Sequence, residues 1–134
     1  MQTLKIQTQG NTDIINITDR IQNILKKSEK QKGIVNVFVI GSTAGITVIE
    51  HEPNLIKDFQ EFFDKIIPKG NYYHHETWRD DNGHSHIRAS LLGPDITIPF
   101  DNNKLILGTW QQIILVDFDT QPRTREVVIS VVER

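Results

Sequence analysis

The segment Ile34–Ile40, IVNVFVI, is the feature that most constrains how this 134-residue chain can fold. Nearly all of its residues are β-branched or aromatic, and the segment is too short for a typical helix. We therefore predict a strand that is buried on both faces. Further strands are predicted from the apolar segments 46–50, 96–100, 104–108, 109–118 and 127–132, and from two weaker segments at 4–8 and 13–17.

Helical patterns occur only in the first half of the chain. One helix is predicted to begin at Thr18 and to end before Gly33, and a second begins at Pro53 and ends before Pro68. These patterns predict a single α+β domain over residues 1–134, with two main helices and a largely antiparallel sheet or sandwich. Two helices cover only one sheet face, so the remaining apolar strand surface predicts a second sheet or a subunit interface.

Composition excludes several classes of function. The net charge is −2, whereas nucleic-acid-binding domains are usually basic, so no nucleic-acid partner is expected. The chain has no cysteine, which excludes disulfides, thiolate metal sites and thiol redox chemistry. The longest apolar run, Ile113–Val116, is far too short to cross a bilayer, and the first residues lack a signal-peptide pattern. We expect a cytoplasmic protein that does not bind membranes.

Four of the five histidines lie within thirteen residues, and this cluster is the strongest chemical signal in the sequence: His74, His75, His84 and His86. If residues 84–92 form a strand, His84, His86 and Arg88 project from one face. Asn82 before the segment and Gly93 after it favour a helix instead, in which only His84 and Arg88 share a face. Both interpretations stay open at this stage.

Neutral imidazoles can bind a divalent cation together. We predict a metal site formed by His74, His84 and His86, with zinc favoured because no thiolate is present and with magnesium as the alternative. From the clustering alone, solvent-exposed histidines in a loop are an equally good interpretation.

Other polar residues are candidates for ligand binding. Arg88 could hold a phosphate through its paired donors, or it could be a surface arginine paired with a nearby aspartate. The small-residue turn at 41–45, GSTAG, offers backbone N–H groups and the hydroxyls of Ser42 and Thr43 to an anion, although most such loops are only turns. Glu50, at the end of an apolar strand, is a candidate general base or metal ligand.

The segment Gly108–Gln112, GTWQQ, joins two predicted strands. Trp110 is predicted to pack into the core beside a glycine bulge. Thr109 and Gln111 then face the opposite side of the strand and could line a pocket.

Several of these motifs occur together in the order of a known family. Residues 83–119, GHSHIRASLLGPDITIPFDNNKLILGTWQQIILVDFD, resemble the signature region of the YjbQ family, and the resemblance extends to residues 71–74 and 34–50. It implies an α+β homotrimer with pockets near the subunit boundaries. It also implies thiamine-phosphate synthesis, in which hydroxymethylpyrimidine diphosphate is joined to thiazole phosphate with release of pyrophosphate. The expected partner is thus a small phosphorylated metabolite.

The resemblance also implies residue roles. Arg88 and a metal would hold the diphosphate, and Glu50 or His86 would transfer protons. Many relatives have a histidine in the turn where this chain has Gly41, and the hypothesis is that His84 replaces that ligand. The alternatives are a non-catalytic trimeric protein that binds a phosphorylated metabolite or a metal, and a metal-dependent hydrolase.

Overall fold

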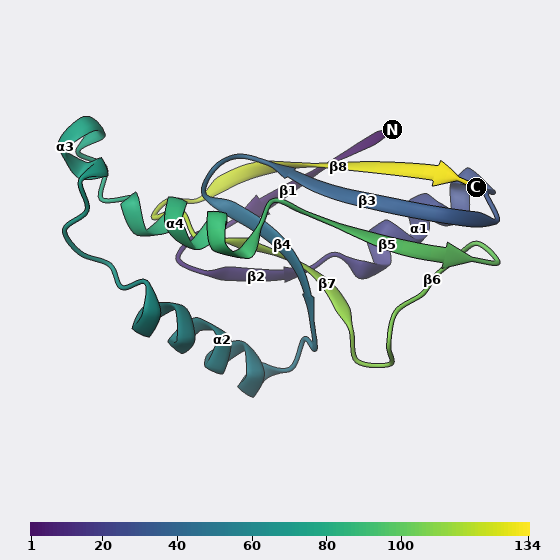
Figure 1. The fold of residues 1–134 in the computed structure, drawn as a ribbon, viewed down its shortest axis with the longest axis horizontal. Coiled ribbons are helices and arrows are strands. Elements are labelled where there is room, and N and C mark those ends of the chain that lie inside the picture. The colour runs from purple at the N-terminus through teal and green to yellow at the C-terminus, as the bar shows by residue number, and fades with distance from the viewer.

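The computed structural model describes all residues, 1–134, and contains eight strands and four helices (Figure 1). The strands are β1 (Gln2–Thr8), β2 (Asp13–Asn16), β3 (Lys32–Ile40), β4 (Ala44–Ile49), β5 (Asp95–Asp101), β6 (Lys104–Leu105), β7 (Gln112–Asp117) and β8 (Arg123–Glu133). The helices are α1 (Thr18–Ser28), α2 (Pro53–Ile66), α3 (His74–Trp78) and α4 (Gly83–Leu92).

The strands form two antiparallel sheets. The larger sheet has the order β1-β8-β3-β5-β6, and the smaller has the order β2-β7-β4. The predicted α+β class with largely antiparallel strands is confirmed. The second sheet also accounts for much of the apolar strand surface that two helices could not cover.

The main core lies between the two sheets, and α1 packs against it. On β3, Val35, Val37 and Val39 are buried because side chains alternate along a strand, and all three belong to one cluster of 15 buried residues. β7 is buried on both faces. Ile113 and Leu115 belong to the main core, and the residues between and after them face the other side of the small sheet.

α2 and α4 cover that other side (Figure 1). A second cluster joins Phe63, Ile67 and Ala89 of this layer to Ile114, Val116 and Phe118. The rings of Phe63 and Phe118 lie 4.9 Å apart between centroids. The predicted start of α2 at Pro53 is confirmed.

Helices are not confined to the first half of the chain, so that part of the prediction is wrong. Residues 83–92 form α4, and the short α3 projects at one end of the molecule (Figure 1). α4 is buried mainly through small or polar residues, so its sequence lacks the apolar stripe that revealed α2. Gly93, with φ at 97°, ends the helix in a conformation that glycine adopts readily.

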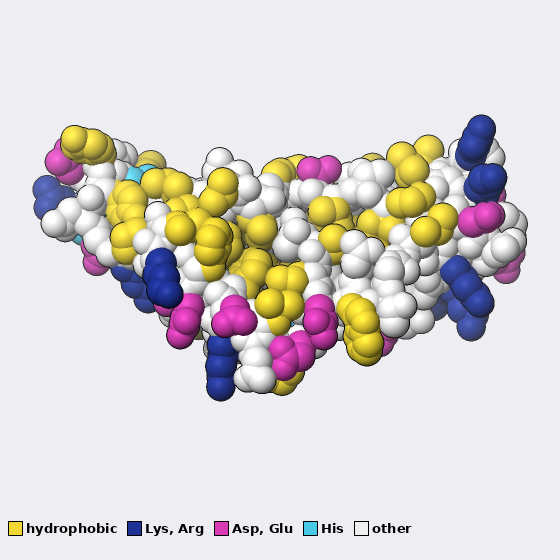
Figure 2. Space-filling view, turned by 60° about the horizontal axis from the view of Figure 1, so that its bottom comes forward, with side chains coloured by type: hydrophobic (Ala, Val, Ile, Leu, Met, Phe, Trp, Pro, Cys, Tyr) yellow, Lys and Arg dark blue, Asp and Glu magenta, His cyan; other side chains and the backbone are white.

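Two apolar surfaces stay uncovered. The outer face of the large sheet exposes Ile34, Phe38, Ile40 and Val132, because no helix packs on it. On the opposite side, hydrophobic side chains gather over the half of the face where α2 and α4 lie (Figure 2). None of the helices has the length and apolarity that crossing a membrane requires.

Candidate functional site

A polar cleft lies between the turn after β3, the first turns of α4 and the segment after β7. It has a volume of ≈ 290 Å³ and is lined by Gly41, Ser42, Thr43, Asp80, Asn82, His86, Asp119, Arg123 and Arg125. A second hollow of ≈ 330 Å³ adjoins it and is lined by Gly41, Ser42, Ala44, His86, Ala89, Ser90 and Pro94. Because His86 and Ser42 line both, a ligand that spans the two hollows would pass the imidazole.

Strand pairing brings these segments together. β4 and β7 are antiparallel, and Ala44 at the start of β4 pairs with Asp117 at the end of β7. The turn before β4 therefore meets the segment after β7 at one edge of the small sheet. α4 can approach this edge closely because Gly45 has no side chain, and a Cβ there would lie 2.8 Å from the Gly93 carbonyl oxygen.

His86 lies beside His74, which reaches it from α3. The two imidazole rings are 4.5 Å apart between centroids, and Nδ1 of His74 lies 3.3 Å from Oδ1 of Asp80. That separation suits an ion pair, but the Nδ1 atom is buried and forms no hydrogen bond. Asp80, His74 and His86 thus form a chain of titratable side chains leading to the cleft.

The surroundings of His86 keep its ring neutral near pH 7. Burial lowers the pKa of His86 first, and the charge on His74 lowers it further. Asp80, Asp119 and the nearby Ser42 backbone act in the opposite direction but do not cancel the shift. A neutral imidazole that faces a cleft can accept a proton from a bound molecule.

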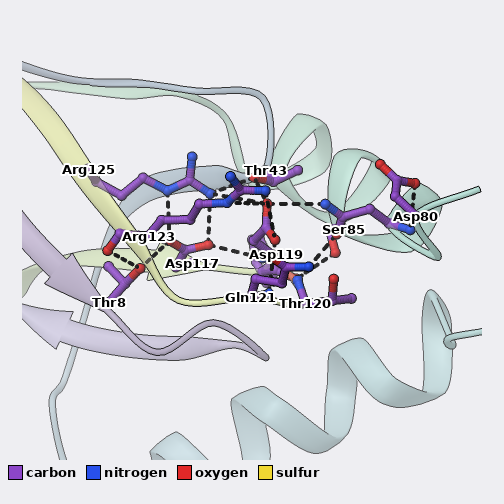
Figure 3. Close-up of polar contacts among 12 residues, drawn as sticks. Thr8, Thr43, Asp80, Ser85, Asp117, Asp119, Thr120, Gln121, Arg123 and Arg125 are labelled. Carbon is purple, nitrogen blue, oxygen red and sulfur yellow. Dashed lines mark hydrogen bonds and ion pairs between the residues drawn. The ribbon is translucent and has the colours of Figure 1, made fainter. Parts of the chain in front are cut away.

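A network of charged and polar side chains forms the floor of the cleft (Figure 3). Nε of Arg125 donates to Oδ2 of Asp117 at 2.7 Å, and Nη2 donates to Oδ1 at 2.9 Å. Nε of Arg123 lies 3.2 Å from Oδ2 of Asp119. The side chains of Asp117, Asp119 and Arg125 are at least 90% buried, whereas that of Arg123 is 48% exposed. Paired carboxylates therefore offset both guanidinium charges, and only Arg123 is open to solvent.

The predicted three-histidine metal site does not form. His84 and His86 are two residues apart on a helix, which turns their side chains about 200° from each other. His84 is buried on the other side of α4, beside Tyr72, so it cannot replace a ligand next to His86. No group of three or more His, Asp or Glu side chains in the chain is arranged to hold a metal ion. The expected divalent metal stays a prediction, and within one chain the rings of His74 and His86 lie side by side.

Arg88 is not placed to bind a ligand, which corrects its predicted role as a phosphate clamp. It is 1% exposed, and Nε donates to the Ile67 carbonyl oxygen at 2.8 Å. Nη1 donates to Oγ1 of Thr12 at 3.1 Å, and Nη2 lies 3.2 Å from Oδ1 of Asp64. All of its contacts are within the protein, and they tie α4 to the end of α2 and to the loop before β2.

Three predicted site residues lie at the far end of the small sheet. Ile49 pairs with Gln112, so Glu50 lies six residues beyond the cleft end of β4, or about 20 Å along the strand direction. Thr109 and Gln111 precede β7 at this same end. Glu50, Thr109 and Gln111 therefore do not join His86, and these three assignments are wrong for a site within one chain.

Trp110 is 70% exposed, so its predicted burial is also wrong. The Gly108 N–H donates to Oε1 of Gln111 at 2.7 Å, and the Gln111 N–H donates to the Gly108 carbonyl oxygen at 3.1 Å. These bonds close a tight turn, so the segment turns away from the core instead of continuing as a strand.

Ser42 and Thr43 do line the cleft, but in different ways. Ser42 is exposed, whereas Thr43 is buried and its hydroxyl is used within the network. The sequence reasoning missed Asp119 and Arg123, which follow the apolar strand β7. The polar segment DFDTQPR at the end of this strand could have indicated them, because the loops that follow strands often carry site residues.

The comparisons with known proteins agree with the fold and identify the family. A family model described as "UPF0047 protein YjbQ-like" matches residues 2–134. The chain belongs to the YjbQ/UPF0047 family. It is 36% identical to a UPF0047 protein of Archaeoglobus fulgidus, over 95% of this chain and 97% of the relative. It is 33% identical to YugU of Bacillus subtilis, over 97% of each chain.

Solved YjbQ structures superpose closely on the chain. One from Clostridium acetobutylicum has a TM-score of 0.90 at 35% identity, and the match covers 98% of this chain and all of that one. Another from Sulfolobus solfataricus has a TM-score of 0.89 at 30% identity, covers 99% and 97%, and is described as a protein of unknown function.

These comparisons correct the expected activity. The YjbQ relatives bear family names alone, and none is named a thiamine-phosphate synthase. Family membership therefore does not make this chain that transferase. The structure also does not place the residues that this transferase activity was expected to use, because Arg88 is internal and Glu50 lies far from His86.

Proposed function

We propose that the cleft binds a small anionic metabolite, a phosphorylated one being the expected case, and that His86 is its proton acceptor. One observation carries this proposal: Arg123 and His86 line the same cleft. Arg123 supplies donors to the anion, and Ser42 supplies an exposed hydroxyl in the same cleft. His86 is neutral near pH 7 because burial lowers its pKa, so it can take up a proton without first losing one.

The charges that line the cleft favour recognition of a ligand through individual hydrogen bonds over long-range electrostatic attraction. Asp117 offsets Arg125, and Asp119 offsets Arg123, so the lining has little net charge. Arg123 uses only the edge of its guanidinium that faces Asp119, and a guanidinium has five N–H donors in total. The remaining donors can form charge-assisted hydrogen bonds, each contributing about 1.5–3 kcal/mol. This arrangement suits one anionic group on a small molecule better than a polyanion.

Titration with inorganic phosphate, followed by protein NMR, tests the binding step. Saturable shifts are expected at the Ser42 amide and at Nε of Arg123. Arg123→Gln should weaken binding about tenfold or more, because it removes charge-assisted hydrogen bonds. Arg20→Gln is the matched control, since Arg20 is exposed on α1 away from the cleft. Equal phosphate binding by the Arg123 and Arg20 variants would contradict the proposal, as would the absence of binding by the wild type.

A second proposal concerns self-association, and the uncovered apolar face of the large sheet supports it. Ile34, Phe38 and Ile40 alternate along β3 toward solvent, and Val132 lies beside them on β8. Exposed apolar surfaces of this kind are typical of protein interfaces. We propose that the chain forms a homotrimer through this face.

Sedimentation should then give three times the 15.4 kDa chain mass. Phe38→Glu should yield a folded monomer, because it places a charge in the centre of the face. Gln7→Glu on the edge strand β1 should leave the mass unchanged. A monomeric or dimeric wild type would refute the trimer.

A further inference from the structure

One buried carboxylate contacts all the segments that form the cleft. Oδ2 of Asp119 accepts hydrogen bonds from Oγ1 of Thr43 at 2.8 Å and from Nδ2 of Asn82 at 3.1 Å. Oδ1 accepts from the Gln121 N–H at 3.0 Å, and the guanidinium of Arg123 is paired with the same carboxylate (Figure 3). Asp119 thus joins the turn after β3, the residue before α4 and the start of β8.

Each of these contacts leads to a group that faces the cleft. Thr43 is next to Ser42, which lines the cleft together with His86. Asn82 directly precedes α4, and its carbonyl oxygen accepts from the His86 N–H at 3.3 Å. Arg123 contacts Asp119 directly. A single side chain therefore links the segments that carry the hydroxyl, the imidazole and the guanidinium.

Asn82 is held from two directions. While its Nδ2 donates to Asp119, its Oδ1 accepts from the Thr120 N–H at 3.3 Å. The Ser85 hydroxyl, one turn into the helix, donates to the Phe118 carbonyl oxygen at 2.6 Å. The first turn of α4 is therefore fixed to the segment after β7, and His86 is carried with it.

We propose that Asp119 is the positioning residue of the cleft, setting the separation of His86, Ser42 and Arg123 without itself reacting. The inference rests on the proposed function only in taking these three groups as those that meet the ligand. Asp119 is suited to this role because it stays ionised. Burial alone would raise its pKa, but the hydrogen bonds from Asn82, Gln121, Thr43 and Arg123 outweigh burial and lower it.

Asp117 offers a matched control. It is also a buried carboxylate, and its partners are Thr8, Arg125 and the Asp119 N–H. It forms no hydrogen bond with Asn82, Arg123 or the first turn of α4, so its loss frees Arg125 but leaves the contacts of Asp119 with Asn82 and Arg123 in place. Both Asp117→Asn and Asp119→Asn should therefore destabilise the fold, but only Asp119→Asn should release the segments that carry His86 and Arg123.

The test is hydrogen exchange of the His86 backbone N–H, which donates to the Asn82 carbonyl oxygen at 3.3 Å, measured by NMR in variants shown to be folded. In Asp119→Asn this proton should exchange at least about tenfold faster than in the wild type, because the carboxylate no longer holds Asn82 and the first turn of α4. In Asp117→Asn it should exchange within about threefold of the wild type. Equal protection in folded Asp119→Asn and wild type would overturn the inference.

Two additions keep the test decisive. If Asp119→Asn does not fold, Asn82→Ala removes, of the contacts of Asp119, only the hydrogen bond that links it to the residue before α4. This variant should show the same loss of protection. Unchanged protection in Asn82→Ala would also overturn the inference. Phosphate titration separates the two proposals. A wild type that binds no phosphate defeats the proposed function, whereas hydrogen exchange at the His86 backbone N–H still decides the role of Asp119.

Discussion

Replacing Arg88 by Met separates a structural role for this residue from a ligand-binding one. The variant leaves two buried acceptors, the Ile67 carbonyl oxygen and Oγ1 of Thr12, without their donor. Each such loss costs about 1–3 kcal/mol. The contact with Asp64 adds little, because the Asp64 side chain is 66% exposed and exposed ion pairs contribute about 0–1 kcal/mol. The methionine stem regains part of the packing, so the expected loss of stability is about 3 kcal/mol.

Urea unfolding followed by circular dichroism measures this loss. For a chain of this size the slope is about 1–3 kcal/mol per molar urea, so the midpoint should fall by about 1–3 M. Arg20→Met is the control, because Arg20 is exposed, and it should change stability by no more than about 0.5 kcal/mol. The reasoning is refuted if Arg88→Met unfolds like the control but loses phosphate binding, since Arg88 would then meet the ligand.

Three further predictions follow from packing and titration. Phe63→Ala should cost about 3–5 kcal/mol in urea unfolding, because Phe63 joins α2 to Phe118; a loss below about 1 kcal/mol would show that α2 is not held there. Gly45→Ala should cost about 1–3 kcal/mol by thermal unfolding, because the new Cβ would meet Gly93 and Leu92, and wild-type stability would show that α4 can shift freely. The pKa values of His84 and His86 are both lowered, mainly by burial, so the folded state binds fewer protons than the unfolded one. Stability should be complete above about pH 6.5 and fall as the pH drops through the folded pKa values, and a urea midpoint that is as high at pH 5.5 as at pH 7.5 would contradict this.

The sequence predicted the elements whose side chains follow one clear period. The segment 34–40 predicted a strand and the apolar stripe of α2 predicted a helix, and both elements are confirmed. The predicted burial of both strand faces is wrong, because Ile34, Phe38 and Ile40 are exposed on the outer face of the sheet. The sequence of α4 is compatible with a helix and with a strand, because the segment is buried through residues such as His84, Ser85 and Arg88, which give no apolar stripe.

The site was harder to predict because its members are brought together by strand pairing. His86 was recognised from the histidine cluster, but its neighbours depend on the register that places Ala44 beside Asp117. Asp119 and Arg123 lie more than thirty residues after His86, and nothing local marks them as its neighbours. Arg88 was misassigned because a buried, fully bonded arginine and a ligand-binding one have the same sequence signature.

The position of β8 has a consequence for how the protein is made. This strand, which is translated after all the others, lies inside the large sheet, between β1 and β3. Until it leaves the ribosome, β1 has no partner in the sheet and one edge of β3 is open. The Thr8–Asp117 contact of the cleft floor likewise joins residues 109 positions apart. Folding therefore depends on long-range pairing, which is slow, and the nascent chain carries open apolar strand edges that favour aggregation. We expect chains that stop before residue 123 to need chaperones or to be degraded, and not to persist with a partly formed site.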